Sequence, residues 1–231
     1  MITLSKRLQA IADLVEPCRV VADIGCDHGF LSIRLVEDGK AEHVIASDVN
    51  EGPIKRAREH IHTEGLDDRI ETIQCDGLSG IMADTVIIAG MGGNLMLKIL
   101  RDSPESVGNA TAFVLQPQSE LKAFRESLQE LGLAITAEDL VIEDGKYYPM
   151  MQVRHGRMDL NELQALYGPV LLAKKHPGLR EYLLYQNQYL KELLNTLRAQ
   201  TGERSRERLQ EVEKELVMNE AALHEWMENT A

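Results

Sequence analysis

Short apolar runs alternate with stretches of helical periodicity through the first two-thirds of the chain. Five runs have the length and composition of buried strands: Arg19–Ile24, His43–Ser47, Ile70–Cys75, Thr85–Ala89 and Ala112–Leu115. The segments between these runs predict four helices, over Leu31–Glu37, Pro53–Glu64, Leu95–Arg101 and Glu120–Leu131. Repeated strand–helix units favour an α/β fold with a parallel sheet, right-handed crossovers and helices on both faces.

Two longer apolar runs follow, Leu133–Ile142 and Tyr147–Arg154, and the segment Glu143-Asp144-Gly145-Lys146 joins them. An Asp-Gly pair between apolar runs is typical of a hairpin turn. We therefore expect the sheet to end in an antiparallel pair, which a dinucleotide-binding dehydrogenase would not have.

The pattern changes at Arg157, after which no strand signal remains and two long helices are predicted. Apolar and polar positions step by three and four residues along both, with a break at Thr201-Gly202. The seam positions are Leu183, Gln186, Leu190, Leu193, Leu197 and Gln200 in the first helix, and Leu209, Val212, Leu216, Asn219, Leu223 and Trp226 in the second. Two such seams separated by a glycine-containing turn predict an antiparallel coiled-coil hairpin, in which polar seam residues set the register or lie near the hairpin ends. We expect one domain over residues 1–156 and a helical hairpin over 157–231.

Composition and charge exclude several classes of protein. The most apolar uncharged stretch, Thr85–Leu97, is shorter than the roughly 20 residues that span a bilayer. The three cysteines form no CxxC pair, which argues against structural zinc and suits a reducing cytoplasm. The net charge is −12, with 15 Lys and Arg against 25 Asp and Glu in residues 1–155 and 10 against 12 in the remainder. The average charge gives no support for nucleic-acid binding, although a few basic residues on one face suffice to bind phosphates.

The loop after the first strand reads Asp23-Ile24-Gly25-Cys26-Asp27-His28-Gly29. Gly25 allows a tight turn and a close approach of the backbone to a ligand. Asp27 occupies the place of the second glycine of a dinucleotide-binding GxGxxG motif, where a side chain would crowd a pyrophosphate and add a negative charge. We therefore expect a neutral or cationic ligand, with Asp23 placed to accept hydrogen bonds from an ammonium group or to fix the loop.

Acidic residues also end the next two strands. Asp48 follows the second strand about 20 residues beyond the glycine loop, where a carboxylate can bind both hydroxyls of a ribose. Asp76 follows the third strand and could accept a hydrogen bond from an adenine amino group. One acidic residue at a strand end is commonly a cap, but three at successive strand ends predict a nucleoside site.

The fourth strand leads into Ala89-Gly90-Met91-Gly92-Gly93-Asn94. Its glycines free the first backbone donors of the following helix and allow a flat group to lie against the chain, while Asn94 either serves that site or caps the helix. The fifth strand ends in Gln116-Pro117-Gln118, in which Gln116 could bind an amide-like base edge. Gln118 fits either that role or a solvated loop.

These motifs resemble those of class I S-adenosylmethionine-dependent methyltransferases, whose seven-stranded Rossmann-like sheet also ends in an antiparallel hairpin. More narrowly, the segments Leu4–Leu8, Ala22–His28, Ala89–Gly93, Leu115–Pro117 and Glu143–Lys146 look like those of the bacterial TrmK family, which methylates N1 of adenine 22 in tRNA and carries a carboxy-terminal helical hairpin.

The resemblance implies a cofactor, a partner and a set of site residues. The cofactor is S-adenosyl-L-methionine, and the implied cofactor-binding residues are Asp23, Gly25, Cys26, Asp48, Val49, Asp76, Gly77, Gly90 and Met91. The implied catalytic residues are Asp27, His28, Gly92 and Gln116. The partner is tRNA, held in part by the hairpin as an arm; we expect no metal, no membrane, a monomer or weak dimer and a cytoplasmic location.

Methyl transfer to N1 of neutral adenine needs no prior deprotonation, so alignment of the reacting atoms is the main task. Asp27 is the first candidate to stabilise the cation that develops on the ring. His28 has two possible roles. It orients the base or stacks on it, or it faces solvent at the start of a helix. Among the scarce aromatic residues, Tyr147 and Tyr148 are available for stacking, whereas Phe30 is expected in the core.

Basic residues near the carboxyl ends of the strands, and others where the helical appendage leaves the first domain, predict a path for RNA across an acidic molecule. They are Lys6, Arg7, Lys55, Arg56, Arg58, Lys174, Lys175, His176 and Arg180. Two alternatives to a tRNA methyltransferase remain open at this point. One is a class I methyltransferase that acts on another RNA, a protein or a small molecule. The other is a non-catalytic nucleoside-binding module whose coiled coil recruits partners.

Overall fold

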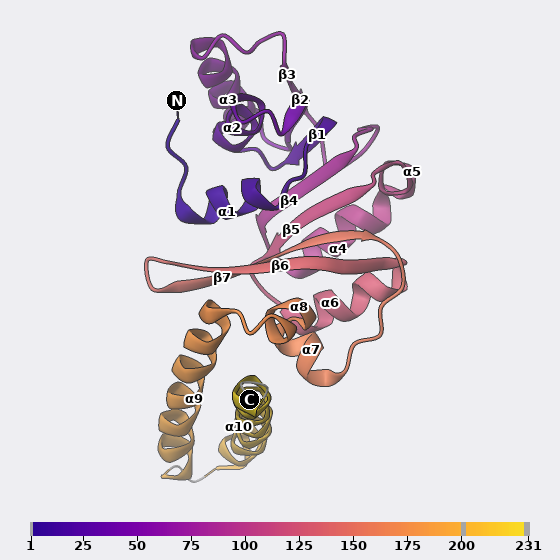
Figure 1. Cartoon of the computed structure of the whole chain (residues 1–231). Helices are drawn as coiled ribbons and strands as arrows, with labels where there is room; N and C mark the ends of the chain where they lie inside the picture. The colour runs from indigo at the N-terminus through magenta and orange to yellow at the C-terminus, as the bar shows by residue number, and fades with distance from the viewer. Residues whose placement is uncertain (1, 200–201, 229–231) are drawn as a thin grey trace. The chain divides into compact units, whose positions relative to one another are not determined.

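The computed structural model describes residues 2–199 and 202–228, and the chain divides into two compact units between Asp159 and Leu160. This division lies close to the boundary expected after residue 156. Figure 1 labels the helices and strands of both units.

The first unit contains a seven-stranded sheet. Its strands are β1 (Cys18–Ile24), β2 (Ala41–Asp48), β3 (Ile70–Gln74), β4 (Thr85–Met91), β5 (Ala112–Pro117), β6 (Leu133–Glu143) and β7 (Lys146–His155). Their order across the sheet is β3-β2-β1-β4-β5-β7-β6. The first five strands pair in parallel, whereas β7 runs antiparallel to both β5 and β6. The antiparallel ending expected from the sequence is therefore confirmed, and Asp144 and Gly145 form its turn with the positive φ values, 50° and 70°, that such a turn needs.

Helices cover both faces of this sheet. They are α1 (Lys6–Leu14), α2 (Phe30–Glu37), α3 (Glu51–Thr63), α4 (Gly93–Asp102), α5 (Pro104–Asn109) and α6 (Leu121–Glu130). One core cluster joins α1, α2 and α3 to alternate strand residues such as Val21 and Val114. The other joins α4, α5 and α6 to their neighbours in sequence, Ala22 and Leu115. Because successive side chains of a strand point to opposite faces, strands covered on both sides need apolar residues at consecutive positions, as in Val20–Ala22 of β1 and Val86–Ile88 of β4.

The order of the strands determines where a ligand can bind. The chain moves outward in one direction from β1 through β2 to β3, and then returns to place β4 on the other side of β1. At such a reversal the loops after the two central strands leave in opposite directions and open a crevice at the carboxyl edge of the sheet. The loops after β1 and β4 are those that carry the glycine motifs.

Helix α1 was not predicted as a helix, although its sequence carries the signals. The Ser5 side chain caps it by accepting a hydrogen bond from the backbone N–H of Leu8 at 3.3 Å, and Ile11 is fully buried on its inner face. The helix lies against the terminal hairpin. The Lys6 N–H donates to the Glu143 carboxylate of β6 at 2.6 Å, and the Gln152 amide of β7 donates to the Leu14 carbonyl at 3.0 Å.

Two predicted helix starts are wrong in detail. Asn94 does not cap α4, because the helix already begins at Gly93 with Gly92 as its N-cap. The α6 helix, predicted from Glu120, begins at Leu121, because Glu120 adopts a left-handed conformation (φ 52°) and makes no side-chain cap; its carboxylate accepts a hydrogen bond from the Ser119 hydroxyl. Close packing explains the first difference: a Cβ at Gly93 would lie 2.7 Å from the Ser119 carbonyl oxygen, so glycine is needed inside the helix.

The second unit is helical over its described residues. It contains α7 (Glu162–Tyr167), α8 (Pro169–Ala173), α9 (Pro177–Arg198) and α10 (Glu203–Glu228), of which the short α7 and α8 were not predicted. Two ion pairs, Lys191–Glu220 and Arg198–Glu213, join α9 to α10. From the first pair to the second the residue number increases in α9 and decreases in α10, so the two helices run antiparallel. The predicted seam residue Gln200 and the break residue Thr201 lie outside the described residues.

The seam between α9 and α10 contains one fully buried polar residue among those that the structure describes, Asn219. Its amide donates to the Leu183 carbonyl at 3.0 Å and to the Gln186 side chain at 3.3 Å, and its oxygen accepts from the Asn187 amide at 2.8 Å. These bonds satisfy the buried amide and can form in one register only, which agrees with the register-setting role expected for polar seam residues.

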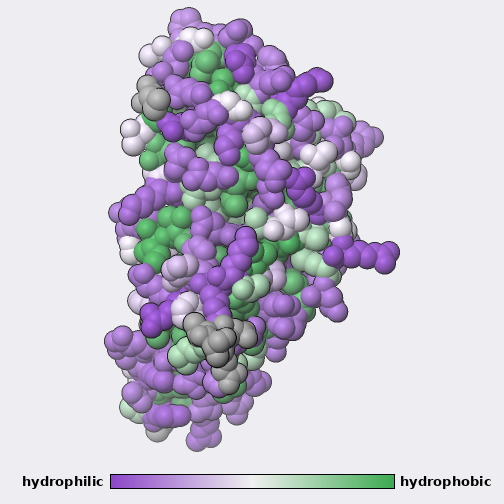
Figure 2. Space-filling view, in the orientation of Figure 1, coloured by the Kyte–Doolittle hydropathy of each residue, from purple (hydrophilic) through white to green (hydrophobic). Residues whose placement is uncertain are grey.

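Among the described helices, none combines the length and the apolar composition that crossing a membrane would require. Hydrophilic residues cover most of the face shown in Figure 2, with smaller hydrophobic areas between them.

Candidate functional site

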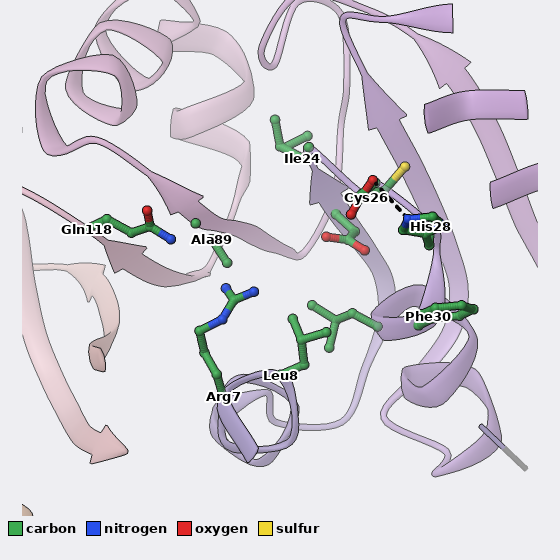
Figure 3. A pocket seen from close by; sticks show the side chains of 13 residues that line it. Arg7, Leu8, Ile24, Cys26, His28, Phe30, Ala89 and Gln118 are labelled. Carbon is green, nitrogen blue, oxygen red and sulfur yellow. Dashed lines mark ion pairs between the residues drawn. The ribbon is translucent and has the colours of Figure 1, made fainter. Parts of the chain in front are cut away.

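A cavity of about 270 Å³ opens where the loops after β1 and β4 separate. It is lined by Arg7, Leu8, Asp23, Ile24, Gly25, Cys26, Asp27, His28, Phe30, Leu31, Ala89, Gly90 and Gln118. Figure 3 shows the labelled lining residues, with Arg7, Ala89 and Gln118 on one side and His28 and Phe30 on the other. The cavity thus gathers residues from the amino-terminal helix, the first loop and the ends of β4 and β5.

The loop after β1 is held in an unusual conformation. Gly25, Asp27 and Gly29 all have positive φ values, 76°, 50° and 72°. The Ser47 carbonyl at the end of β2 accepts hydrogen bonds from the backbone N–H groups of both Gly25 and Cys26, at 2.8 and 2.9 Å. A left-handed aspartate is uncommon and is tolerated where the surrounding structure fixes it, often at functional sites.

Asp23 is the buried carboxylate of the cavity, with 4% of its surface exposed. The hydroxyl of Ser32 donates to it at 2.6 Å, and no other side-chain bond to it is found in the described part of the chain. Burial raises the pKa of Asp23 to about 6, since desolvation disfavours the charged form, and the Ser32 bond offsets part of this effect. A cationic ligand group beside Asp23 would stabilise the ionised form.

Cys26 lies between acidic groups. Burial is the main cause that raises the pKa of its thiol, and the charges of Asp23, Asp48 and Asp27 add to the effect. The thiol is therefore neutral and unreactive at physiological pH, and Cys26 serves as a small wall residue. Asp48 itself is partly exposed at the end of β2, where it accepts a hydrogen bond from the Asn50 N–H at 2.9 Å.

Asp27 and His28 stand at the solvent side of the cavity. The Asp27 carboxylate lies 3.6 Å from the His28 ring and 3.4 Å from the Arg56 guanidinium. The expectation that Phe30 packs in the core is wrong: its ring is partly exposed, lines the cavity and stacks between His28 and His60, with centroid distances of 5.5 and 4.6 Å. His60 supports the loop, because its Nδ1 hydrogen-bonds the His28 carbonyl at 2.9 Å and must therefore carry the proton.

Gln116 is fully buried behind the cavity wall. Its amide oxygen accepts from the Arg7 guanidinium and from the Gly90 N–H, both at 3.1 Å. Arg7 also lies over the ring of Tyr148, 5.7 Å from its centroid. Gln116 therefore ties together α1, the β4 loop and β5.

Comparison with known proteins agrees with this fold and site. Residues 4–151 match the protein family described as Methyltransferase domain. The tRNA (adenine(22)-N(1))-methyltransferase of Bacillus subtilis is 36% identical over 159 residues, which span 68% of this chain and 67% of that protein. The chain belongs to the TrmK family.

Crystal structures of relatives extend the similarity beyond the catalytic unit. The B. subtilis m1A22 tRNA methyltransferase TrmK superposes with a TM-score of 0.84 at 29% identity, covering 96% of this chain and all of that one. A Streptococcus pneumoniae relative in complex with S-adenosyl-L-methionine gives a TM-score of 0.86 at 29% identity, with 96% and 100% coverage. The TrmK family fold, including a class I methyltransferase sheet and a carboxy-terminal helical pair, therefore accounts for nearly the whole chain.

The cavity of this TrmK family member brings together six of the residues predicted from the sequence: Asp23, Gly25, Cys26, Asp27, His28 and Gly90. Asp48 ends β2 and Val49 follows it, and Asp76 and Gly77 follow the neighbouring β3, so these four lie along the same edge of the sheet rather than in the cavity wall. Met91 contacts the loop from behind, because a Cβ at Gly25 would lie 2.5 Å from its methyl carbon. Gly92 caps α4, and Gln116 is buried.

Sequence reasoning missed the role of two residues of the site. Arg7 was expected only on an RNA path, because the helix that carries it was not predicted. His60 lies on α3, 32 residues after the loop residue whose carbonyl it contacts, and no local sequence signal links the two.

Proposed function

We propose that this chain transfers the methyl group of S-adenosylmethionine to N1 of adenine 22 in tRNA, as its TrmK relatives do by name. The observation that carries the proposal is the buried, sparsely bonded Asp23 at the switch point of a methyltransferase sheet. The similarity to tRNA methyltransferases over most of the chain supplies the substrate class.

The residues of the site fit this cofactor, which carries an ammonium group, a sulfonium and a nucleoside. Asp23 would accept hydrogen bonds from the ammonium, and its burial favours an ion pair over hydration. Asp48 would bind the ribose hydroxyls, and Asp76 on the adjacent strand end would accept from the adenine amino group. Val49, exposed directly after β2, would cover an apolar face of the nucleoside.

When bound, the cofactor supplies an electrophilic methyl group. The chain's own task is to hold the target base beside it, since alignment at about 3–3.5 Å can contribute roughly 7–11 kcal/mol. Asp27 would stabilise the positive charge that develops on the base, and Arg56 limits how far its carboxylate moves. The His28, Phe30 and His60 rings offer a flat surface on which a base turned out of the tRNA could stack. Gln116 acts through Arg7 and Gly90 rather than by touching the base.

The helical unit would serve as an arm for the body of the tRNA. Lys174 and Arg180 are exposed there and Lys175 is half-buried, but Lys175 and Arg180 lie over the ring of Trp226, at 5.8 and 5.6 Å from its centroid. Lys174 is thus the clearest phosphate ligand of the predicted basic cluster. A cytoplasmic monomer or weak dimer would suit an enzyme of tRNA maturation.

The proposal is tested by incubating the full chain with S-adenosylmethionine labelled in its methyl group and an unmodified tRNA transcript. We expect label in N1-methyladenosine at position 22, and none in a transcript that carries guanine at that position. Cofactor binding without methylation of any tRNA would support a non-catalytic module, and labelling of other substrates would support a different methyltransferase.

A further inference from the structure

The Asp27 carboxylate, which the proposed function assigns to the target base, is already paired with an arginine. The Nη2 atom of Arg56 lies 3.4 Å from Oδ1 of Asp27, and the Nε2 atom of His28 lies 3.6 Å from the same oxygen. Within the described residues the second oxygen, Oδ2, has no hydrogen-bond or ion-pair partner. A guanidinium thus holds a positive charge beside the carboxylate whose negative charge the reaction would use.

The ion pair between Arg56 and Asp27 is weak and open to exchange. Its separation of 3.4 Å exceeds the value of about 2.7–2.9 Å that is typical of charge-assisted hydrogen bonds. The two side chains are 46% and 66% exposed, and exposed pairs contribute little to stability. Among residues 2–199 and 202–228, Asp27 accepts the one hydrogen bond that this guanidinium donates, so its other N–H groups are free for a second acceptor.

Arg56 reaches the carboxylate from outside the cavity. Asp27 lines the cavity, whereas Arg56 does not, and extends from the second turn of α3. The backbone of the glycine loop holds Asp27 without help from Arg56, because the Cys26 carbonyl accepts a hydrogen bond from the Gly29 N–H at 2.8 Å. The guanidinium can therefore leave the carboxylate while the loop keeps its conformation.

The chemistry of a turned-out nucleotide fits this arrangement. Its base enters a pocket, while the phosphates on either side of it stay with the backbone outside. A phosphate offers an arginine two oxygens for a bidentate contact, whereas Asp27 offers Arg56 a single oxygen. The better acceptor for Arg56 is thus one that arrives only with the RNA.

If the proposed function holds, the RNA is tRNA and the nucleotide is its target adenosine. We propose that a phosphate next to this nucleotide takes Arg56 away from Asp27, so that Asp27 becomes an unpaired carboxylate only in the tRNA complex. Asp27 then faces the ring on which positive charge develops, without a guanidinium charge that would oppose it. Arg56 thereby makes the readiness of the site depend on contact with the tRNA backbone.

The exchange predicts that Asp27 and tRNA compete for Arg56. Binding of an unmodified tRNA transcript to the full chain is measured with S-adenosylhomocysteine, the cofactor without its methyl group, so that no transfer occurs. Arg56→Gln should weaken binding about 5- to 10-fold and flatten its salt dependence by roughly 0.7–0.9 in log–log slope, as for one lost phosphate contact. Asp27→Asn should tighten binding about two- to fivefold, the range of exposed ion pairs. In the Arg56→Gln background the same change should bring no comparable gain, because no guanidinium is left to release.

The rate of single-turnover methylation at saturating tRNA is the second readout. Arg56→Gln should keep the wild-type rate, because Asp27 is unpaired in both complexes, whereas Asp27→Asn should be slow. Arg101→Gln is the matched control. Arg101 pairs with Glu130 at 3.2 Å, with side chains 48% and 72% exposed, on helices that cover the other face of the sheet. Its loss should change neither the tRNA affinity, the salt dependence nor the rate.

Three results would overturn the proposal. An equal gain from Asp27→Asn with and without Arg56 would mean that Asp27 repels the RNA directly. An unchanged salt dependence for Arg56→Gln would mean that no phosphate contacts Arg56. A rate for Arg56→Gln as low as that of Asp27→Asn would mean that Arg56 holds the carboxylate in place during transfer. A wild-type chain that neither binds nor methylates tRNA would instead overturn the proposed function itself.

Discussion

Ionisation of the buried Asp23 carboxylate destabilises the fold, whereas binding of a cationic ligand group needs the ionised form. Its pKa of about 6 in the folded chain exceeds the ordinary value of 3.8, so folding disfavours the ionised form, which still predominates above pH 6. Its contribution to stability is therefore fully present below pH 3.8 and is lost as the pH rises through 6. At pH 8 the free energy of unfolding is lower than at a pH below 3.8 by about 3 kcal/mol from this group, because each pKa unit corresponds to about 1.4 kcal/mol.

We expect Asp23→Asn to raise the free energy of unfolding of the unliganded chain by about 1–3 kcal/mol at pH 8, and by much less at pH 4.5. Urea unfolding at the two pH values measures both. The same variant should lose most of its affinity for S-adenosylhomocysteine, and the wild type should bind more tightly as the pH rises through 6. An equal stability change at both pH values would show that Asp23 is not the titrating group.

Asp48→Ala should weaken S-adenosylhomocysteine binding by about 1.5–3 kcal/mol, because a ribose hydroxyl pair would lose a charged acceptor. Calorimetry checks this, and 5′-methylthioadenosine should show the same loss, since it keeps the ribose. Asp67→Ala, which removes an exposed carboxylate paired with His62, is the control and should change neither affinity. If Asp48→Ala binds both compounds normally, the ribose lies elsewhere.

Asp27 is best tested by Asp27→Asn, because asparagine also tolerates the left-handed conformation and only the charge is removed. We expect single-turnover methylation of tRNA to slow about tenfold or more, with cofactor affinity nearly unchanged. The effect should be smaller than the roughly 10²–10³-fold typical of a buried catalytic hydrogen bond, since the side chain is 66% exposed. Loss of cofactor affinity with a normal rate of transfer would make Asp27 a cofactor ligand instead.

At the scale of single elements, the strands and the hairpin could be predicted because their signals are local. Runs of apolar residues mark strands buried on both faces, and Asp144-Gly145 determines the turn. Phe30 shows the limit of this reasoning: an aromatic residue at the start of a helix is expected in the core, but stacking with His28 and with the distant His60 holds it at the cavity. The predicted seam residue Leu193 packs, partly buried, against the cluster of Leu190 and Val212, and its neighbour Leu194, which was not predicted, is the more deeply buried of the two.

The polar seam residue of the hairpin yields a prediction at this scale. Asn219→Ala should destabilise the helical unit by about 1–3 kcal/mol, because buried partners lose their hydrogen bonds. Thermal unfolding followed by circular dichroism measures the effect, and affinity for S-adenosylhomocysteine should remain normal. Asn195→Ala, at an exposed position of α9, makes the same change in helix propensity and should cost nothing. Equal thermal stability of the Asn219→Ala and Asn195→Ala variants would show that Asn219 does not set the register of the two helices.

For the whole molecule, the question is how an acidic protein binds tRNA. Removal of residues 160–231 should abolish tRNA methylation and leave S-adenosylhomocysteine binding intact, with circular dichroism as the test that the remaining unit folds. In the full chain, replacing Lys174, Lys175 and Arg180 by alanine should flatten the salt dependence of tRNA binding, by roughly 0.7–0.9 in log–log slope for each phosphate that the variant no longer neutralises. Full methylation by the truncated chain would show that the helical unit serves another purpose.

The place of β7 between β5 and β6 has a consequence for the order in which the protein becomes functional during synthesis. β6 leaves the ribosome before β7, yet its strand partner is β7, so the sheet cannot close until Lys146–His155 is available. Domains generally form from the amino terminus as the chain elongates. Here the amino-terminal helix must wait, because Glu143 and Tyr148, which hold Lys6 and Arg7, belong to that last hairpin. A nascent chain that stalls before β7 would carry every glycine and aspartate of the site and still lack the fixed arginine.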